Sequence, residues 1–86
     1  MTGCPPFQIQ IYGSLEDALT KVRAAAAKKG ISFPGNMERG NFSGEGVQGF
    51  YTVNGQIVTI TITERTGMAG FVSCSRVENE IRNFFR

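Results

Sequence analysis

The stretch VQGFYTVNGQIVTITITE, residues 47–64, carries the pattern that decides the fold. Two runs rich in β-branched and aromatic residues flank Asn54-Gly55, a dipeptide typical of a type I′ hairpin turn. With these two residues as the loop, the pattern pairs Val53 with Gln56, Tyr51 with Val58, Gly49 with Ile60 and Val47 with Ile62. Apolar residues then fall on one side of the hairpin and threonines on the other, which is typical of a sheet covered on one face.

The two faces of this hairpin differ in chemistry. The expected inner face carries Val47, Tyr51, Val53, Val58, Ile60 and Ile62, and the expected outer face carries Gln48, Phe50, Thr52, Ile57, Thr59, Thr61 and Thr63. On the outer face, the predicted pairing makes Phe50 and Ile57 diagonal neighbours. We expect the helices on the inner face, so the sequence predicts a low-charge binding surface formed by Phe50, Ile57, Thr52 and Thr59.

The sequence before the hairpin predicts a strand and a helix. FQIQIY, residues 7–12, alternates apolar and polar residues, which indicates a half-buried strand. Ser14, followed by two acidic residues, indicates the start of a helix, and Gly30 indicates its end. Between them lies one apolar stripe, made by Leu15, Ala18, Leu19, Val22, Ala25 and Ala26. A further strand is expected over residues 41–43, with Gly44 ending it.

After the hairpin, the sequence predicts a second helix. Ser75 and Glu78 have the spacing of a capping box, and Glu78 and Arg82 have that of a favourable i,i+4 ion pair. The predicted order of elements is therefore β-α-β-β-β-α. This order indicates a two-layer α+β fold, with an antiparallel sheet and both helices on one face. At 86 residues, the chain is expected to form a single domain over residues 1–86.

Composition excludes several classes of function. The chain has no histidine, so the Ser-His and Cys-His nucleophile arrangements are absent, and two cysteines alone do not make a zinc site. We therefore predict no metal and no cofactor. The net charge of +2 is small, which disfavours a nucleic-acid partner. No apolar run is long enough for a transmembrane segment, and no signal peptide is recognised, so a cytoplasmic location is expected.

A glycine pattern at the start of the hairpin resembles a phosphate-binding loop. Residues 44–49, GEGVQG, match G-x-G-x-x-G, but a dinucleotide-binding loop needs a helix directly after the glycines. Here the glycines lead into another strand. We therefore interpret Gly44 and Gly46 as turn or bulge residues, and Gly49 as a position where a large neighbour packs.

Three functional hypotheses follow. The leading one is a non-enzymatic binding module that associates with itself, with a protein partner or with an apolar surface. The second is a thiol-dependent enzyme or redox protein using Cys74, whose thiol precedes a helix, although the interpretation as a buried apolar residue is favoured. Whether Cys4 and Cys74 pair is left open. The third is binding of single-stranded nucleic acid through Phe50 and Tyr51, which is disfavoured because these two side chains point to opposite faces.

Most of the chain resembles a known family. The run FSGEGVQGFYTVNGQIVTITI, with SLEDALTKVRAAAAK before it and SRVENEIRNFF after it, is similar to small proteins of the polyhydroxyalkanoic-acid system, or granule-region, family. The matching positions are Phe42, Gly44, Gly46, Val47, Gly49, Val77, Glu78 and Ile81. The chain departs from the family in having Gly13-Ser14 where a histidine is common, and in lacking a proline over residues 68–73. The resemblance implies no activity, but it does imply a link to polyester granules and so to an apolar granule surface.

Overall fold

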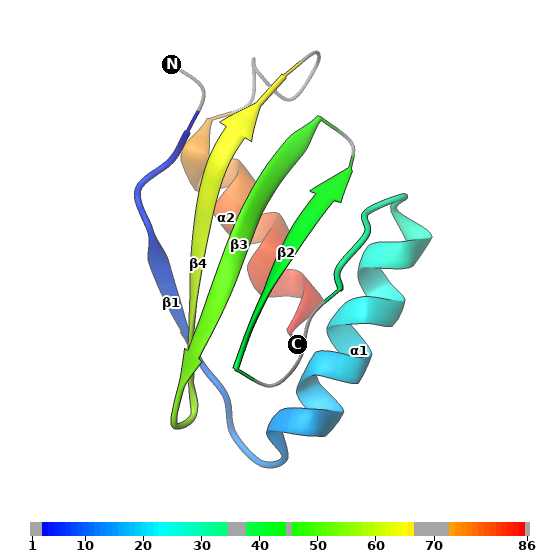
Figure 1. The fold of residues 1–86 in the computed structure, drawn as a ribbon, viewed down its shortest axis with the longest axis vertical. Coiled ribbons are helices and arrows are strands. Elements are labelled where there is room, and N and C mark those ends of the chain that lie inside the picture. Colours follow the sequence, from blue (N-terminus) through cyan, green and yellow to red (C-terminus); the bar gives the residue numbers. More distant parts are fainter. Residues whose placement is uncertain (1–2, 35–37, 45, 67–72, 86) are drawn as a thin grey trace.

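The computed structural model describes residues 3–34, 38–44, 46–66 and 73–85. Along them the elements are β1 (Phe7–Gln10), α1 (Leu15–Lys28), β2 (Arg39–Gly44), β3 (Val47–Asn54), β4 (Ile57–Arg65) and α2 (Cys74–Phe84), as shown in Figure 1. The predicted order β-α-β-β-β-α is confirmed. The sequence also has a turn signal at residues 33–36 and a less regular stretch at residues 68–74, and positions 35–36 and 68–72 of these lie outside the described residues.

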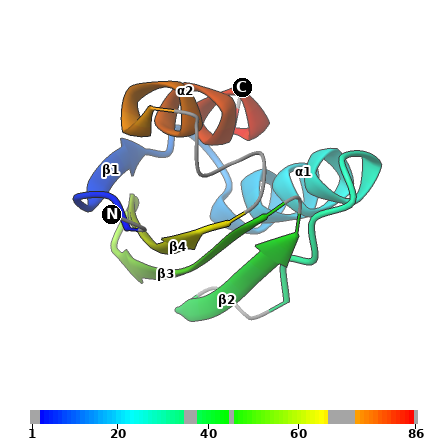
Figure 2. The same ribbon diagram turned by 90° about the horizontal axis from the view of Figure 1, so that it is seen from above.

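The strands form one antiparallel sheet in the order β1-β4-β3-β2. The β3–β4 hairpin lies at its centre, and the chain crosses from one edge to the other through α1 (Figure 1). Figure 2 shows α1 and α2 on the same side of the sheet. The fold is therefore the α+β architecture that the one-sided apolar pattern of the hairpin predicts.

The core lies between the sheet and the two helices. Buried apolar side chains come from every element: Phe7, Ile9, Ile11, Leu19, Val22, Ala26, Phe33, Phe42, Tyr51, Val58, Ile60, Ile62, Val77, Ile81 and Phe84. The apolar stripe of α1 packs inward as predicted, because Leu19, Val22 and Ala26 recur at helical spacing. A core built from alternate residues of each strand leaves the opposite set of strand residues facing outward.

Both ends of α1 follow the predicted capping chemistry. The Ser14 hydroxyl accepts a hydrogen bond from the Asp17 N–H at 3.2 Å. At the other end Gly30 takes φ +75°, and the Ile31 N–H donates to the Ala26 carbonyl at 2.9 Å. This is a Schellman-type ending, in which the residue after the glycine folds back on the last turn.

The start of α2 differs from the prediction by two residues. Ser73, not Ser75, is the N-cap, and its hydroxyl accepts from the Arg76 N–H at 3.2 Å. The predicted capping box is therefore wrong. The sequence pattern favoured Ser75 because Glu78 follows it at capping-box spacing. However, Ser75 lies inside the helix, and the extended backbone of Ser73 (φ −65°, ψ 155°) is the one that fits an N-cap.

The predicted ion pair on α2 is present. The Arg82 Nε lies 2.8 Å from the Glu78 carboxylate, at the expected i,i+4 spacing. Glu78 therefore serves as a partner for the next turn of the helix and not as a capping residue. The geometry agrees with the usual preference for an acid placed N-terminal to a base on a helix face.

The hairpin register is shifted from the predicted one. Asn54 pairs with Ile57, so the two loop residues are Gly55 and Gln56. Gly55 takes φ +64° at the first loop position. The Gln56 side-chain amide donates to the carbonyls of Ile11 at 3.2 Å and Gly13 at 2.9 Å, which fixes the turn against the end of β1. These contacts lie more than forty residues away along the chain, so local turn chemistry did not reveal them.

The shift changes the pairs but keeps the faces. Tyr51 pairs with Ile60 and Gly49 with Ile62, each moved by two residues, and an even shift leaves every side chain on its predicted side. However, Phe50 now pairs with Thr61, and Ile57 lies at the far end of the hairpin opposite Asn54. The prediction that Phe50 and Ile57 are diagonal neighbours is therefore wrong.

A β-bulge interrupts β4. Gln48 pairs with Glu64 while Gly49 pairs with Ile62, so Thr63 is an extra residue on this strand. The Thr63 hydroxyl donates to the Gln48 carbonyl at 3.2 Å. The bulge reverses the alternation beyond it, which turns Arg65 toward the core at 9% exposure and leaves Glu64 on the outer side. The sequence predicted that Val47 pairs with Ile62, but the two-residue shift of register and the one extra residue of the bulge together make Arg65 its partner.

The glycines of the G-x-G-x-x-G pattern have structural roles. They connect β2 to β3, with Gly44 at φ +144° and Gly46 at φ +80°. A Cβ on Gly49 would meet the Thr61 carbonyl oxygen and lie 2.5 Å from the Phe42 ring. Gly49 therefore makes room for a large aromatic neighbour, as predicted, and strand β3 stands where a dinucleotide-binding loop would need a helix.

Candidate functional site

The first candidate site is the outer face of the sheet, which we define as the outward side chains of its four strands. Figure 2 shows no helix of the described chain on this side. Strand alternation and the observed pairing place on it Gln8, Gln10, Arg39, Asn41, Ser43, Gln48, Phe50, Thr52, Asn54, Ile57, Thr59, Thr61, Thr63 and Glu64. This face is polar, with few charges and a single aromatic ring among these residues.

Phe50 projects from the middle of the outer face. It is 40% exposed and stands between Asn41 on β2 and Thr61 on β4. Beside it is a shallow hollow of about 390 Å³, lined by Pro34, Asn41, Phe42, Ser43, Gln48, Gly49, Phe50 and Thr63. An exposed aromatic ring on a face that no described helix covers is typical of a surface that takes part in association.

The other predicted surface residues are arranged unevenly around Phe50. Thr52 is its neighbour on the same face of β3 and pairs with Thr59 on β4, so these three side chains lie close together. Ile57, half-buried next to the hairpin turn, adjoins Thr59 along β4 and lies diagonal to Thr52, but it is separated from Phe50. The four predicted residues thus share one part of the outer face, but Phe50 and Ile57 lie at its opposite ends and are not neighbours.

Two opposite charges lie symmetrically about Phe50. Arg39 on β2 pairs with Thr52, so it lies on the strand next to that of Phe50 and is displaced by two residues toward the β3–β4 turn. Glu64 on β4 pairs with Gln48, so it lies on the strand on the other side of Phe50 and is displaced by two residues away from the β3–β4 turn. Both side chains are exposed. The sequence did not predict this arrangement, because it depends on the bulge that turns Glu64 outward.

The sulfur of Cys74, for which a reactive thiol is one hypothesis, is covalently bonded in the structure. Cys74 forms a disulfide with Cys4, with their Cα atoms 5.6 Å apart. The bond joins the start of α2 to the segment before β1, and a thiolate nucleophile would exist only after reduction. The pairing that the sequence left open is thus present, and no described cysteine is free.

The remaining chemical hypotheses find little support in the geometry. Tyr51 is fully buried, so it is not available to stack on a nucleic-acid base beside Phe50. Among the described residues, no three histidine, cysteine, aspartate or glutamate side chains come together in a group that could hold a metal ion.

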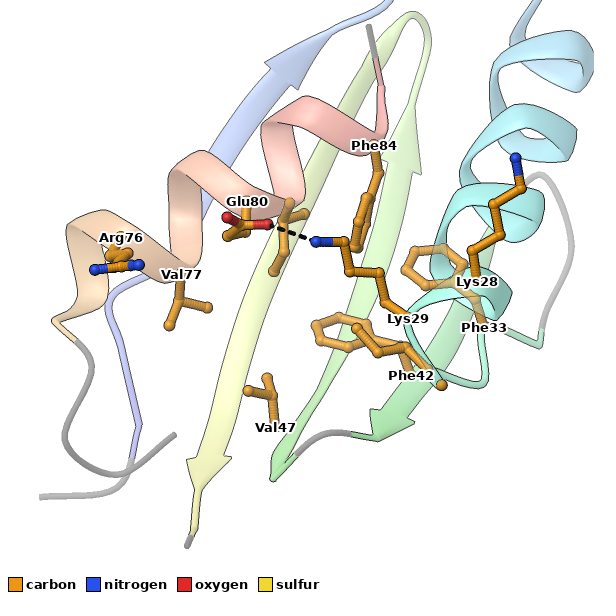
Figure 3. Close-up of a pocket in the computed structure, with 12 residues that line it drawn as sticks. Lys28, Lys29, Phe33, Phe42, Val47, Arg76, Val77, Glu80 and Phe84 are labelled. Carbon is orange, nitrogen blue, oxygen red and sulfur yellow. Dashed lines mark ion pairs between the residues drawn. The ribbon is translucent and has the colours of Figure 1, made fainter. Parts of the chain in front are cut away.

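The second candidate site is a groove between α1 and α2, which sequence reasoning did not predict. Its volume is about 580 Å³. Its lining, drawn in Figure 3, consists of Lys28, Lys29, Gly30, Ile31, Phe33, Phe42, Val47, Arg76, Val77, Glu80, Ile81 and Phe84. Lys28 and Lys29 lie near the end of α1 in the sequence, and a helical pattern does not state how far a second helix lies from the first, so it did not indicate a groove beside them.

Comparison with known proteins does not extend these observations. No protein-family model matches the chain, and neither curated proteins nor solved structures give a significant match. The resemblance to the granule-region family therefore stays a prediction. Neither of the helices in the described ranges is long and apolar enough to cross a membrane.

Proposed function

We propose that this protein is a non-enzymatic interaction module that forms a homodimer through the outer face of its sheet. The observation that carries the proposal is the exposed Phe50 ring beside a hollow on a face that no described helix covers. Threonines and amides surround the ring, and a low-charge sheet surface of this kind favours association. The proposal takes a second copy as the partner because the face is complementary to itself.

Self-complementarity follows from the positions of the charges. Consider two copies that face each other through their outer faces, related by a two-fold axis that lies in the plane between the two sheets. If this axis passes through Phe50, it sets the two Phe50 rings against each other. If the axis is perpendicular to the line from Arg39 to Glu64, each Arg39 faces Glu64 of the second copy. From ordinary strand and residue spacings, the strands of the two sheets then cross at about 70°. This angle belongs to the orthogonal class of sheet packing.

We expect the dimer to be weak. Phe50 is already partly buried within one copy, and polar side chains make up most of the surrounding face. Burial of the ring contributes less than the roughly 1.5–3 kcal/mol of a fully exposed phenylalanine. Exposed ion pairs add about 0.2–1 kcal/mol each. A dissociation constant in the micromolar range, on the order of 1 µM or weaker, is therefore expected.

Sedimentation velocity tests the proposal with a matched pair of variants. Phe50→Asp removes the central aromatic ring, whereas Tyr12→Asp makes a similar change at another exposed aromatic residue, beyond the end of β1. From about 10 µM to about 1 mM, we expect the wild type and Tyr12→Asp to shift toward dimer and Phe50→Asp to stay monomeric. A monomeric wild type throughout this range, or equal dimerisation of all three proteins, would refute the proposal.

A granule surface is the alternative partner of the outer face, as the family resemblance implies. The polar residues around Phe50 favour a second copy over a purely apolar surface.

Cytoplasmic location also stays a proposal, and the disulfide gives it a direct test, because structural disulfides persist mainly in oxidising compartments. Thiol alkylation in intact cells should find Cys4 and Cys74 reduced if the protein is cytoplasmic. The alternative of thiol chemistry at Cys74 would also require that reduced state.

A further inference from the structure

The groove between α1 and α2 has an aromatic floor and charged side chains at its mouth. We propose that it binds a single-chain amphiphile with an anionic head, of the fatty-acid class. Both helices lie on the side of the sheet opposite the outer face (Figure 2), and the groove is lined by residues of these helices, so this proposal does not rest on dimerisation.

The lining of the groove suits an apolar chain. Phe33 stacks on Phe42 with ring centroids 5.4 Å apart, and on Tyr51 with centroids 5.1 Å apart. Phe33 and Phe42 form the floor of the groove, and Val77 and Phe84 stand on its α2 side (Figure 3), where Ile81 also lines it. The volume of about 580 Å³ lies within the usual range of small-molecule pockets, about 300–1,000 Å³.

The charges at the groove favour an anion. Its polar lining includes the cations Lys28, Lys29 and Arg76 and one carboxylate, Glu80. Lys29 reaches across from the end of α1 to Glu80 on α2, with 3.7 Å between its Nζ and the carboxylate oxygen (Figure 3). Both side chains remain more than half exposed, so the ammonium is accessible to an incoming head group. Cations outnumber carboxylates here, which opposes a cationic head and attracts an anionic one.

The ion pair across the groove provides a matched test. Lys29→Gln and Glu80→Gln break the same contact, so they should change stability equally, by little for an exposed pair. Their effects on an anionic ligand should be opposite. Lys29→Gln removes a cation and should weaken binding about threefold, whereas Glu80→Gln removes a repelling carboxylate and should strengthen it about threefold.

Isothermal titration calorimetry with laurate, below its micelle concentration and at low salt, measures these effects. We expect saturable binding of laurate, weaker binding of octanoate because less apolar surface is buried, and no binding of dodecyltrimethylammonium. Phe50→Asp should bind laurate as the wild type does, which separates this proposal from dimerisation. The proposal is overturned by an absence of saturable laurate binding, by equal binding of the cationic amphiphile, or by equal effects of Lys29→Gln and Glu80→Gln.

Discussion

Loss of the Cys4–Cys74 disulfide should strongly destabilise the fold. The two cysteines are separated by 70 residues, so the bond closes most of the chain into one loop. The chain-entropy relation for a loop of this length gives about 4 kcal/mol of stabilisation, and measured values are commonly about 2–4 kcal/mol. At about 0.05–0.15 kcal/mol per residue, a protein of this size has a total stability of about 4–13 kcal/mol. The disulfide should therefore account for a large share of the free energy of unfolding.

Urea unfolding followed by far-ultraviolet circular dichroism measures this contribution. The oxidised wild type should unfold at a clearly higher urea concentration than the same protein in dithiothreitol. The Cys4→Ser/Cys74→Ser variant should match the reduced wild type and should not respond to dithiothreitol. If the wild type has the same midpoint with and without the reductant, the reasoning from loop closure is refuted. A response of the double variant to dithiothreitol would show that the reductant acts by another route.

Two further substitutions test local features of the fold. Gly49→Ala should destabilise the protein by about 1–3 kcal/mol in urea unfolding, because the new methyl group would meet the Thr61 carbonyl and the Phe42 ring; an unchanged midpoint would contradict the close packing there. Ser73→Ala should cost about 1 kcal/mol by loss of the N-cap, while Ser75→Ala should stay within about 0.5 kcal/mol. The reverse order would restore the capping box that the sequence predicted.

The fold was predictable because its strongest signals are local. The alternation through residues 47–64 defines two strands and a buried face, and the stripe from Leu15 to Ala26 defines a helix that must cover that face. Ser14 and Gly30 mark the ends of this helix through contacts within one turn. These features require no knowledge of distant residues, so a single sequence contains them.

The features that the sequence missed depend on contacts between distant segments. The hairpin register is fixed by hydrogen bonds from Gln56 to the end of β1, and the bulge at Thr63 breaks an alternation that looks continuous in the sequence. The disulfide requires strand β1 and helix α2 to begin near each other, which only the topology establishes.

The difference between local patterns and contacts of distant segments also explains which parts of the candidate sites were predictable. Phe50, Thr52 and Thr59 were found on the outer face because an even shift of register leaves faces unchanged. Ile57 was misplaced relative to Phe50 because distances along the face do depend on register. The groove was missed entirely, since it arises from the spacing of α1 and α2 over Phe33 and Phe42, and no local pattern encodes that spacing.

Charge reversal at Arg39 and Glu64 tests the proposed dimer most directly. In a two-fold dimer, Arg39→Glu sets like charges against each other twice, and so does Glu64→Arg, so each variant alone should associate more weakly than the wild type. An equimolar mixture of the two variants forms opposite-charge contacts at both positions. Sedimentation velocity should therefore show a heterodimer in the mixture at concentrations where each variant alone is monomeric. If the mixture sediments as the average of the separate variants, the two-fold packing through Phe50 is wrong.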